Sequence, residues 1–190
     1  MSDLERIVRR MADATNAARA SFQIWKALRS SDEKSRRLRI QLNDPKFVEF
    51  FHAAISAHYK IVFLEIGCLF DSDHRSASVR SLKRHLKSAQ LKHLIELVDD
   101  KLTDKAKVVE GVLLIRSRLI AHRDITAEST EIHTSAEISP DMLESLIEDV
   151  SFLINHVSDQ LGIQPQPLVS ITRLYADATY QLGQAIEQHR

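Results

Sequence analysis

Glycine and proline are scarce in this chain, and their scarcity limits the fold more than any other feature. The 190 residues include four glycines and four prolines, whereas sandwiches and barrels of β-strands need such residues at many tight turns. Hydrophobic residues make up 44% of the chain and aromatic residues 6%, which suits helices packed around a sizeable core. We therefore predict an all-α protein, an up-and-down bundle of five or six helices in one domain over residues 1–190.

Apolar spacing and capping residues locate the helices of the first half. Apolar residues at helical intervals predict a helix over about 4–28, and the charged stretch RSSDEKSRRLR that follows is a mobile connection or a short helix. Asp44 is a good N-cap and Pro45 suits the first helical position. The helix that they begin, KFVEFFHAAISAHYKIVFLEIGCLF, is apolar nearly all round, so we expect it to be central and well buried.

The second half contains three more predicted helices. A basic helix begins at Ser76 or Ser78 and runs to about residue 98, and the next one begins at Thr103 or Asp104. ITAESTEIHTSAEI is a polar connection that could include a weak hairpin. The sequence Ser-Pro-Asp at 139–141 begins a helix that extends to about residue 161 and stops at a glycine. After QPQP, a last amphipathic helix covers about 168–188.

Compartment and solubility follow from what the chain lacks. Cys68 is the only cysteine, so we expect no disulfide and a reducing environment. The first residues, MSDLERIVRR, are charged and carry no apolar segment, so we expect no secretory signal. The longest apolar run, IVFLEIGCLF, is too short to span a membrane and contains Glu65. We expect a cytoplasmic protein without a membrane partner.

Charges are separated along the chain although the formal net charge is zero. Between residues 75 and 93 there are six Lys or Arg and no acid, and between residues 124 and 160 there are nine Asp or Glu and no Lys or Arg. Each run is either the solvated side of a helix or a binding face for a partner of opposite charge. The acidic run could dock a regulatory protein.

Common catalytic motifs are missing. The nine histidines form no HExxH, Cys68 has no ligand at a metal-binding spacing, and neither a GxSxG elbow nor a glycine-rich phosphate loop occurs. We therefore predict neither a metal nor a cofactor. The remaining candidate is IRSRLIAHRD at 115–124, which follows the apolar run VVEGVLLI. It contains Arg116, Ser117 and His122.

Spacing alone does not make Arg116 and His122 a site. An Arg followed by a His after four to six residues occurs by chance, and RSLKRH at 80–85 is a second example. Six α-helical residues advance about 9 Å and turn about 240°, so Arg116 and His122 share a face only if the helix ends between them. Otherwise two subunits must assemble the site. A purely structural alternative also exists, because cationic His122 and Arg123 suit a helix C-terminus.

The order of segments resembles the HEPN superfamily, and most closely its U-type abortive-infection branch. The resemblance covers about residues 44–161 and rests on LFD at 69–71 and on RSRLIAHRD, in which Arg116, Ser117 and His122 match the family pattern. It implies a phage-defence or toxin protein. Asp124 stands where HEPN toxins that are silenced by nucleotide transfer carry a tyrosine, which argues against that regulation and against a nucleotidyltransferase antitoxin.

The resemblance implies a metal-independent endoribonuclease that acts as a homodimer, with two motifs across the two-fold axis. Arg116 would bind the phosphate, His122 would serve as acid or base, and Ser117 would orient one of the reacting groups. The products would be a 2′,3′-cyclic phosphate and a 5′-hydroxyl. The alternative is a non-catalytic helical dimer that binds RNA, a nucleotide or a protein. The residues expected to bind RNA are Arg80, Lys83, Arg84, Lys87, Arg118 and Arg123.

Overall fold

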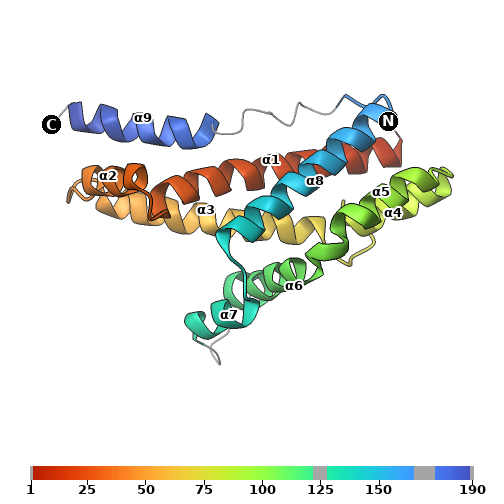
Figure 1. Ribbon diagram of the computed structural model, residues 1–190, viewed down its shortest axis with the longest axis horizontal. Helices are drawn as coiled ribbons and strands as arrows, with labels where there is room; N and C mark the ends of the chain where they lie inside the picture. Colours follow the sequence, from red (N-terminus) through yellow and green to blue (C-terminus); the bar gives the residue numbers. More distant parts are fainter. Residues whose placement is uncertain (1, 122–127, 165–173, 189–190) are drawn as a thin grey trace.

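The computed structural model describes residues 2–121, 128–164 and 174–188, and within these ranges the chain forms helices and no strand (Figure 1). The all-α prediction is confirmed. A 3₁₀ turn, η1 (Thr103–Lys105), and a π-helix, η2 (Ile115–Ala121), interrupt the series of α-helices. The α-helices are α1 (Asp3–Arg29), α2 (Glu33–Leu42), α3 (Val48–Leu69), α4 (Val79–Ser88), α5 (Lys92–Leu102), α6 (Ala106–Leu114), α7 (Ser129–Ala136), α8 (Pro140–Gln160) and α9 (Leu174–Gln188).

Two long antiparallel helices, α1 and α3, run side by side and form the axis of the molecule (Figure 1). Ser2 caps α1 by accepting a hydrogen bond from the backbone N–H of Glu5, and α1 ends at Arg29 as its apolar spacing predicts. Buried Met11 and Phe22 of α1 belong to the same core cluster as buried Val62 and Ile66 of α3. Each such side chain contributes roughly 1.5–3 kcal/mol by leaving water.

Other helices cover the axis at both ends. Helix α8 crosses α1 and also contacts α5, while α4 and α5 form a hairpin at one end of the molecule (Figure 1). Helix α8 begins where the sequence predicts, with Ser139 as N-cap and Pro140 in the first turn. At the opposite end, α2 and α9 pack against each other and against α1. A second, smaller core lies there, centred on Leu28, Leu38 and Phe51.

The prediction of one continuous basic helix up to about residue 98 is wrong, because two helices cover this stretch. Ser78 is the N-cap, and Ser81 completes a capping box, but the helix stops at Ser88 and α5 starts at Lys92. Gln90 lies in the left-handed region with φ of 61°, which turns the chain back so that α5 packs against α4. No glycine or proline marks this break, so residues 88–92 contain no local signal for it.

The predicted polar connection with a weak hairpin at 125–138 is also wrong in its described part. Residues 129–136 form α7, whose buried Ile132 and Ala136 pack in the main core. Glu128 and Glu131 form a capping box at its start. The break between α4 and α5 and the additional helix α7 explain why the described residues form more helices than the five or six predicted.

Helix α3 differs from its prediction in two respects. The predicted caps Asp44 and Pro45 lie in a turn, in which the Asp44 carboxylate accepts from the Lys46 N–H, and the helix itself begins at Val48. It is also not buried all round, because Phe50 is 65% exposed and Leu64 37% exposed. An apolar face of α3 is therefore open to solvent.

The last predicted helix is confirmed over 174–188, where α9 lies, and its first six predicted residues fall outside the described ranges. None of the described helices combines the length and the apolar character that crossing a membrane requires.

Candidate functional site

The segment that carries the candidate motif leaves α-helical geometry. Helix α6 ends at Leu114, and the next seven residues form η2, a π-helix. Hydrogen bonds in a π-helix join residues five apart, so its turn takes more than 3.6 residues, and such turns are frequent at functional sites. Ile115, at the start of η2, is 1% exposed and holds the segment to the core. The α-helical rotation assumed from the sequence therefore does not apply between residues 115 and 121.

Arg116 reaches from η2 across to the end of α3. Its Nη1 donates a hydrogen bond to the Gly67 carbonyl oxygen at 3.1 Å, and its Nη2 donates to Oδ2 of Asp71, also at 3.1 Å. The side chain of Arg116 is 27% exposed and that of Asp71 is 25% exposed. A guanidinium has five N–H donors. These two bonds therefore leave three donors that a phosphate could use.

Gly67 makes room for this arrangement. A Cβ on Gly67 would collide with Cδ of Arg116 and would lie 3.2 Å from its Nε. Because Gly67 is buried inside a helix with ordinary helical backbone, the close approach of the arginine is what requires a glycine there.

Asp71 is held as an anion. The backbone N–H of Asp73 donates to Oδ1 of Asp71 at 2.9 Å and is the largest cause that lowers the Asp71 pKa, and the hydrogen bond and charge of Arg116 lower it further. The carboxylate therefore stays ionised at neutral pH. It fixes the guanidinium of Arg116 through a charge-assisted bond.

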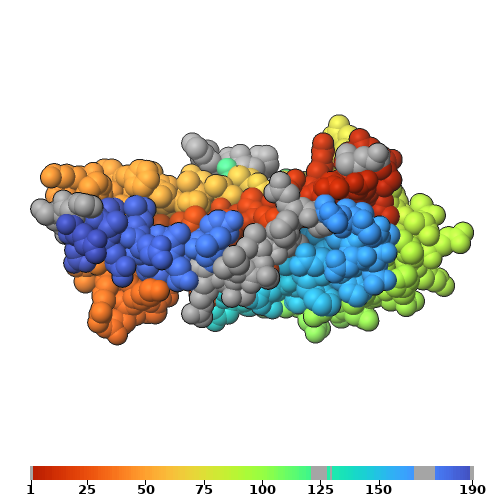
Figure 2. Space-filling model, turned by 90° about the horizontal axis from the view of Figure 1, so that it is seen from above, coloured from red at the N-terminus to blue at the C-terminus, as the bar shows by residue number. Residues whose placement is uncertain are grey.

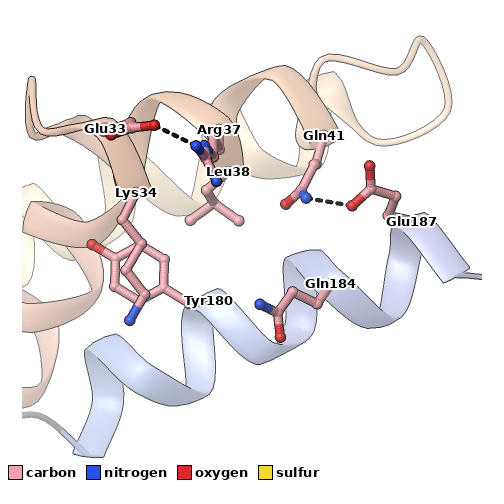
Figure 3. A pocket seen from close by; sticks show the side chains of 8 residues that line it. All are labelled: Glu33, Lys34, Arg37, Leu38, Gln41, Tyr180, Gln184 and Glu187. Atoms are coloured by element: carbon pink, nitrogen blue, oxygen red, sulfur yellow. Dashed lines mark hydrogen bonds and ion pairs between the residues drawn. The ribbon is translucent and has the colours of Figure 1, made fainter.

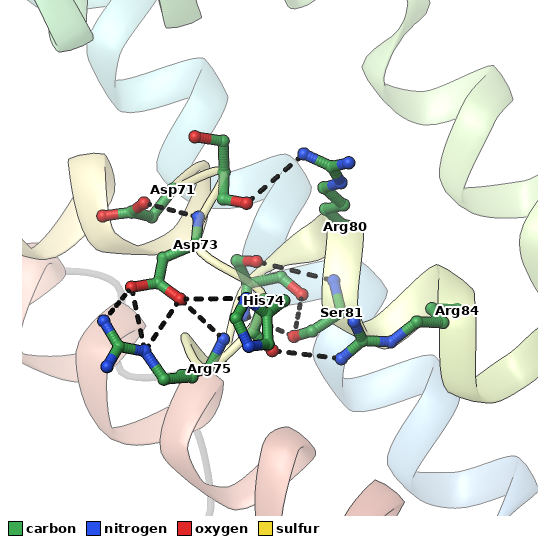
Figure 4. Close-up of polar contacts among 9 residues, drawn as sticks. Asp71, Asp73, His74, Arg75, Arg80, Ser81 and Arg84 are labelled. Carbon is green, nitrogen blue, oxygen red and sulfur yellow. Dashed lines mark hydrogen bonds and ion pairs between the residues drawn. The ribbon is translucent and has the colours of Figure 1, made fainter.

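The loop between α3 and α4 is braced by its own polar contacts (Figure 4). Asp73 accepts hydrogen bonds from the backbone N–H and the guanidinium of Arg75, which together hold the pKa of Asp73 well below its usual range. Arg80 and Arg84, from α4, donate to the carbonyl oxygens of Ser72 and His74 at 3.3 Å and 3.1 Å. The loop that carries Asp71 is thus tied to α4.

These contacts give two of the predicted RNA-binding residues a structural task. Arg80 and Arg84 lie on α4, and part of their donor capacity is used on the loop. Lys83 forms an ion pair with Asp99 of α5, whereas Lys87 is exposed at the end of α4. RNA binding by these four side chains stays a prediction.

The structure locates only part of the predicted catalytic set. Ser117 and Arg118 are exposed on η2, one and two residues after Arg116. His122 and Arg123 lie outside the described residues, so the pairing of Arg116 with His122 stays a prediction. Cys68 follows Gly67, and burial raises the pKa of its thiol although the Arg116 charge opposes this. The thiol is therefore protonated at neutral pH and is a poor nucleophile.

The residues that hold Arg116 are not predicted from the sequence. The resemblance rests in part on LFD at 69–71, but it assigns no contact to Asp71 and does not include Gly67. A signal did exist for the glycine, because it is one of four in the chain and stands inside an apolar helix, where glycine often marks a close approach.

An exposed stripe of α3 lies beside this site. It consists of Phe50, Ala53, Ala57, Leu64 and Cys68, which 3.6 residues per turn place on one face of the helix. Gly67 and Asp71 come from positions adjacent to that face, so Arg116 lies along its edge. We name this surface the α3 stripe. Across the described ranges, no three side chains of His, Cys, Asp or Glu gather in a way that could hold a metal.

Comparison with known proteins supports one family. A family model described as AbiU2, of the HEPN type, matches residues 1–179. Neither curated proteins nor solved structures gave a match. The family match covers the Arg116–Asp71 pair and the whole of α3.

Proposed function

This chain belongs to the AbiU2 family of HEPN domains, an abortive-infection type, and from this we propose that it is a metal-independent endoribonuclease that acts in phage defence. The observation that carries the proposal is the anchored Arg116. Its guanidinium is held at two points by Gly67 and Asp71, and it presents its remaining donors beside exposed Ser117. A cation fixed in this way suits the charge that develops on a phosphodiester during cleavage.

The chemistry needs three tasks. The 2′-hydroxyl oxygen of RNA attacks the adjacent phosphorus, a base accepts its proton, and the P–O5′ bond breaks as an acid protonates the leaving oxygen. In our proposal Arg116 binds the non-bridging oxygens of the pentavalent phosphorus, and His122 transfers protons. Ser117 orients the 2′-hydroxyl or the imidazole. The products are a 2′,3′-cyclic phosphate and a 5′-hydroxyl, and no metal takes part.

The α3 stripe supports a dimeric arrangement. Exposed Phe50 and Leu64 form an apolar surface that a second copy would cover. In a two-fold dimer the same surface serves both partners, so the two α3 helices would face each other. Because Arg116 lies beside the C-terminal end of the stripe, a two-fold axis close to Leu64 would bring both copies of Arg116 toward one cleft. We therefore propose that the homodimer forms through α3.

Incubation of the purified protein with single-stranded RNA in the presence of EDTA tests this function. We expect cleavage by the wild type and none by Arg116→Ala or His122→Ala. Arg6→Ala is the matched control, because Arg6 makes only a surface ion pair with Asp3. Cleavage that requires a divalent metal, or that persists in both alanine variants, would contradict the proposal.

An alternative function has an observation in its favour. An arginine held by a carboxylate also serves a purely structural purpose, and Arg116 joins η2 to α3. The alternative is a non-catalytic helical dimer that binds RNA, a nucleotide or a protein partner, such as an antitoxin on the acidic run. It predicts that Arg116→Ala lowers stability and that wild type leaves RNA intact.

A further inference from the structure

A second cationic region lies at the opposite end of α3 from Arg116. There the end of α1, the outer side of α2 and the first turns of α3 enclose a groove of about 440 Å³. We name it the α2 groove. Its floor is apolar, since it includes Leu28 and Phe51, which are 2% and 7% exposed, and its wall includes Ile40, which is 75% exposed. A concave apolar surface of this size can take up a small planar group.

Three arginines border the α2 groove. Arg36 donates from Nε to the Ser31 carbonyl oxygen at 3.0 Å, and Arg39 donates from Nη1 to the Ser30 carbonyl oxygen at 2.6 Å. These bonds orient the two guanidinium groups and leave most of their N–H donors for a ligand. Arg29 borders the same groove.

The charge of the three arginines is not neutralised within the described part of the chain. No Asp or Glu lines the groove, and none of Arg29, Arg36 and Arg39 has an ion pair with a described residue. Three positive charges gathered around one groove favour the binding of an anion there. Arginine suits phosphate best, since its planar fork can bind two oxygens at once.

The other side of α2 provides the contrast (Figure 3). In the pocket between α2 and α9, Arg37 forms an ion pair with Glu33. Gln41 donates a hydrogen bond to Glu187, and the Lys34 ammonium lies over the ring of Tyr180. Charges on this side are therefore satisfied by neighbours. Among contacts with described residues, the cations of α2 that have no carboxylate partner lie on the α2 groove side of the helix.

We propose that the α2 groove binds one unit of a single-stranded RNA, with a base on the apolar floor and its phosphates on Arg29, Arg36 and Arg39. This inference rests on the proposed function for the identity of the polymer. Stacking or apolar contact of a base and cationic contact of its phosphates are the two interactions that single-strand sites combine. The groove supplies both within one concave surface.

The groove and the proposed cleavage site can act on one strand. Phe51 and Gly67 are separated by 16 residues of α3, which corresponds to about 24 Å along the helix. The groove residues of α3 lie on the side opposite to the α3 stripe, so a second copy bound there leaves the groove open. An RNA that occupies both sites must therefore span several nucleotides. The groove then acts as a binding site that holds the substrate away from the point of cleavage.

Fluorescence anisotropy with labelled single-stranded RNA tests the proposal. All proteins carry Arg116→Ala so that the RNA stays intact, and the RNA has about 16 nucleotides, the upper end of single-strand site sizes. The test variant is Arg29→Gln, Arg36→Gln and Arg39→Gln combined. We expect it to bind at least tenfold more weakly than its parent. The slope of log affinity against log salt concentration should be less steep by about 2, since each phosphate contact on a single strand contributes about 0.7 to that slope.

Two further variants separate binding from folding. Arg37→Gln removes the same charge from the same helix but on the α9 side, and we expect unchanged affinity. Arg29→Gln alone disturbs no hydrogen bond among the described residues, and we expect a threefold to fivefold loss with a salt dependence lower by about 0.7. Equal affinity of the triple variant and its parent would overturn the proposal. Equal losses in Arg37→Gln and the triple variant would overturn it as well.

The occupant is tested by competition. Poly-glutamate of the same charge should displace the RNA poorly, because it offers no base for the floor, and Ile40→Ser should weaken RNA binding without changing its salt dependence. Displacement by poly-glutamate as effective as by unlabelled RNA would instead assign the groove to an acidic protein and would overturn the RNA proposal. The outcomes also separate the two proposals. Binding at the groove with no cleavage by wild type would refute the ribonuclease proposal, whereas cleavage by wild type with unchanged RNA affinity of the groove variants would refute the groove proposal.

Discussion

The two ends of α3 hold their arginines in different ways. At the C-terminal end, one guanidinium is fixed by a carbonyl oxygen of the helix and by ionised Asp71. At the N-terminal end, three arginines are oriented by carbonyl oxygens or left free, and no carboxylate lines their groove in the described part of the chain. A carboxylate partner fixes the position of an arginine but cancels its positive charge. Its absence preserves charge and thus affinity for an anion.

This difference predicts a division of labour between the two ends. The Arg116–Asp71 pair is about a quarter exposed, and the desolvation of two largely buried charges offsets much of their attraction, so stability alone is a weak reason for the pair. Exact positioning is a stronger reason, because the rate of a reaction depends steeply on geometry. Variants of the C-terminal end should therefore change the rate of cleavage. Variants of the N-terminal end should change affinity and its salt dependence.

The largest expected effect is that of Arg116→Ala on the rate. Removal of one preorganised donor to the transition state costs about 10²–10³ in rate, so we expect kcat to fall by at least a hundredfold. RNA affinity should change less than threefold, because the α2 groove is intact. Single-turnover cleavage and anisotropy measure the two quantities. A large loss of affinity with little loss of rate would reverse the roles assigned to the two ends.

Next in size is the effect of Leu64→Glu on assembly. A charge at Leu64, one turn before the C-terminal end of the α3 stripe, should weaken self-association at least tenfold, since burial of a leucine contributes roughly 1.5–3 kcal/mol. Sedimentation equilibrium measures this, and cleavage should fall in parallel while the groove of each protomer still binds RNA. Ser56→Glu, which adds the same charge at an exposed position of the same helix outside the α3 stripe, is the control. A variant that remains dimeric would place the interface elsewhere.

Asp71→Asn should have an intermediate effect of about tenfold on kcat. The amide still accepts hydrogen bonds but no longer attracts the guanidinium, so Arg116 loses its fixed position. Because the pKa of Asp71 is lowered in the folded protein, its contribution to stability is present above the ordinary carboxyl pKa of about 3.9 and is lost as the pH falls through the lowered value. Wild-type cleavage should therefore show no titration of Asp71 between neutral pH and about pH 5.

The control for this variant is Asp3→Asn, which removes a surface partner of Arg6. It should leave kcat unchanged. If Asp71→Asn lowers affinity for RNA instead of kcat, the carboxylate is not a positioning residue for Arg116.

The smallest effect is expected from Gly67→Ala. Alanine favours a helix by roughly 0.5–1 kcal/mol over glycine, which offsets part of the cost of displacing the anchored Arg116 side chain from the new Cβ. The melting temperature should therefore stay nearly constant while kcat falls by about twofold to fivefold. Ser56→Ala, on the exposed side of α3, is the matched control. A fall in melting temperature with unchanged kcat would mean that Gly67 serves packing rather than the position of Arg116.

The fold was predictable where local signals agree with packing. Helices α1 and α8 have clear N-caps and apolar spacing, so their starts were predicted within a few residues. The break between α4 and α5 was not, since Gln90 adopts a positive φ that tertiary packing imposes. Helix α7 was missed because its sequence is mostly polar and only Ile132 and Ala136 face the core.

For the site, the sequence identified the motif but not its support. Arg116 was found through a family pattern, which is local in the chain. Its contacts with Gly67 and Asp71 join residues 49 and 45 positions apart. Such contacts depend on how α3 and η2 pack, and spacing along one helix contains no information about them. The arginines of the α2 groove were missed for the same reason, because they were read as part of a charged connection.

One measurement tests the central claim that the anchored Arg116 cleaves RNA: the mapping of 5′-hydroxyl RNA ends in a bacterial host after the protein is induced. Our account predicts new 5′-hydroxyl ends, each paired with a 2′,3′-cyclic phosphate on the upstream fragment, in cells that express the wild type. It predicts none in cells that express equal amounts of Arg116→Ala. The same ends in both strains, or new ends in neither, would contradict it.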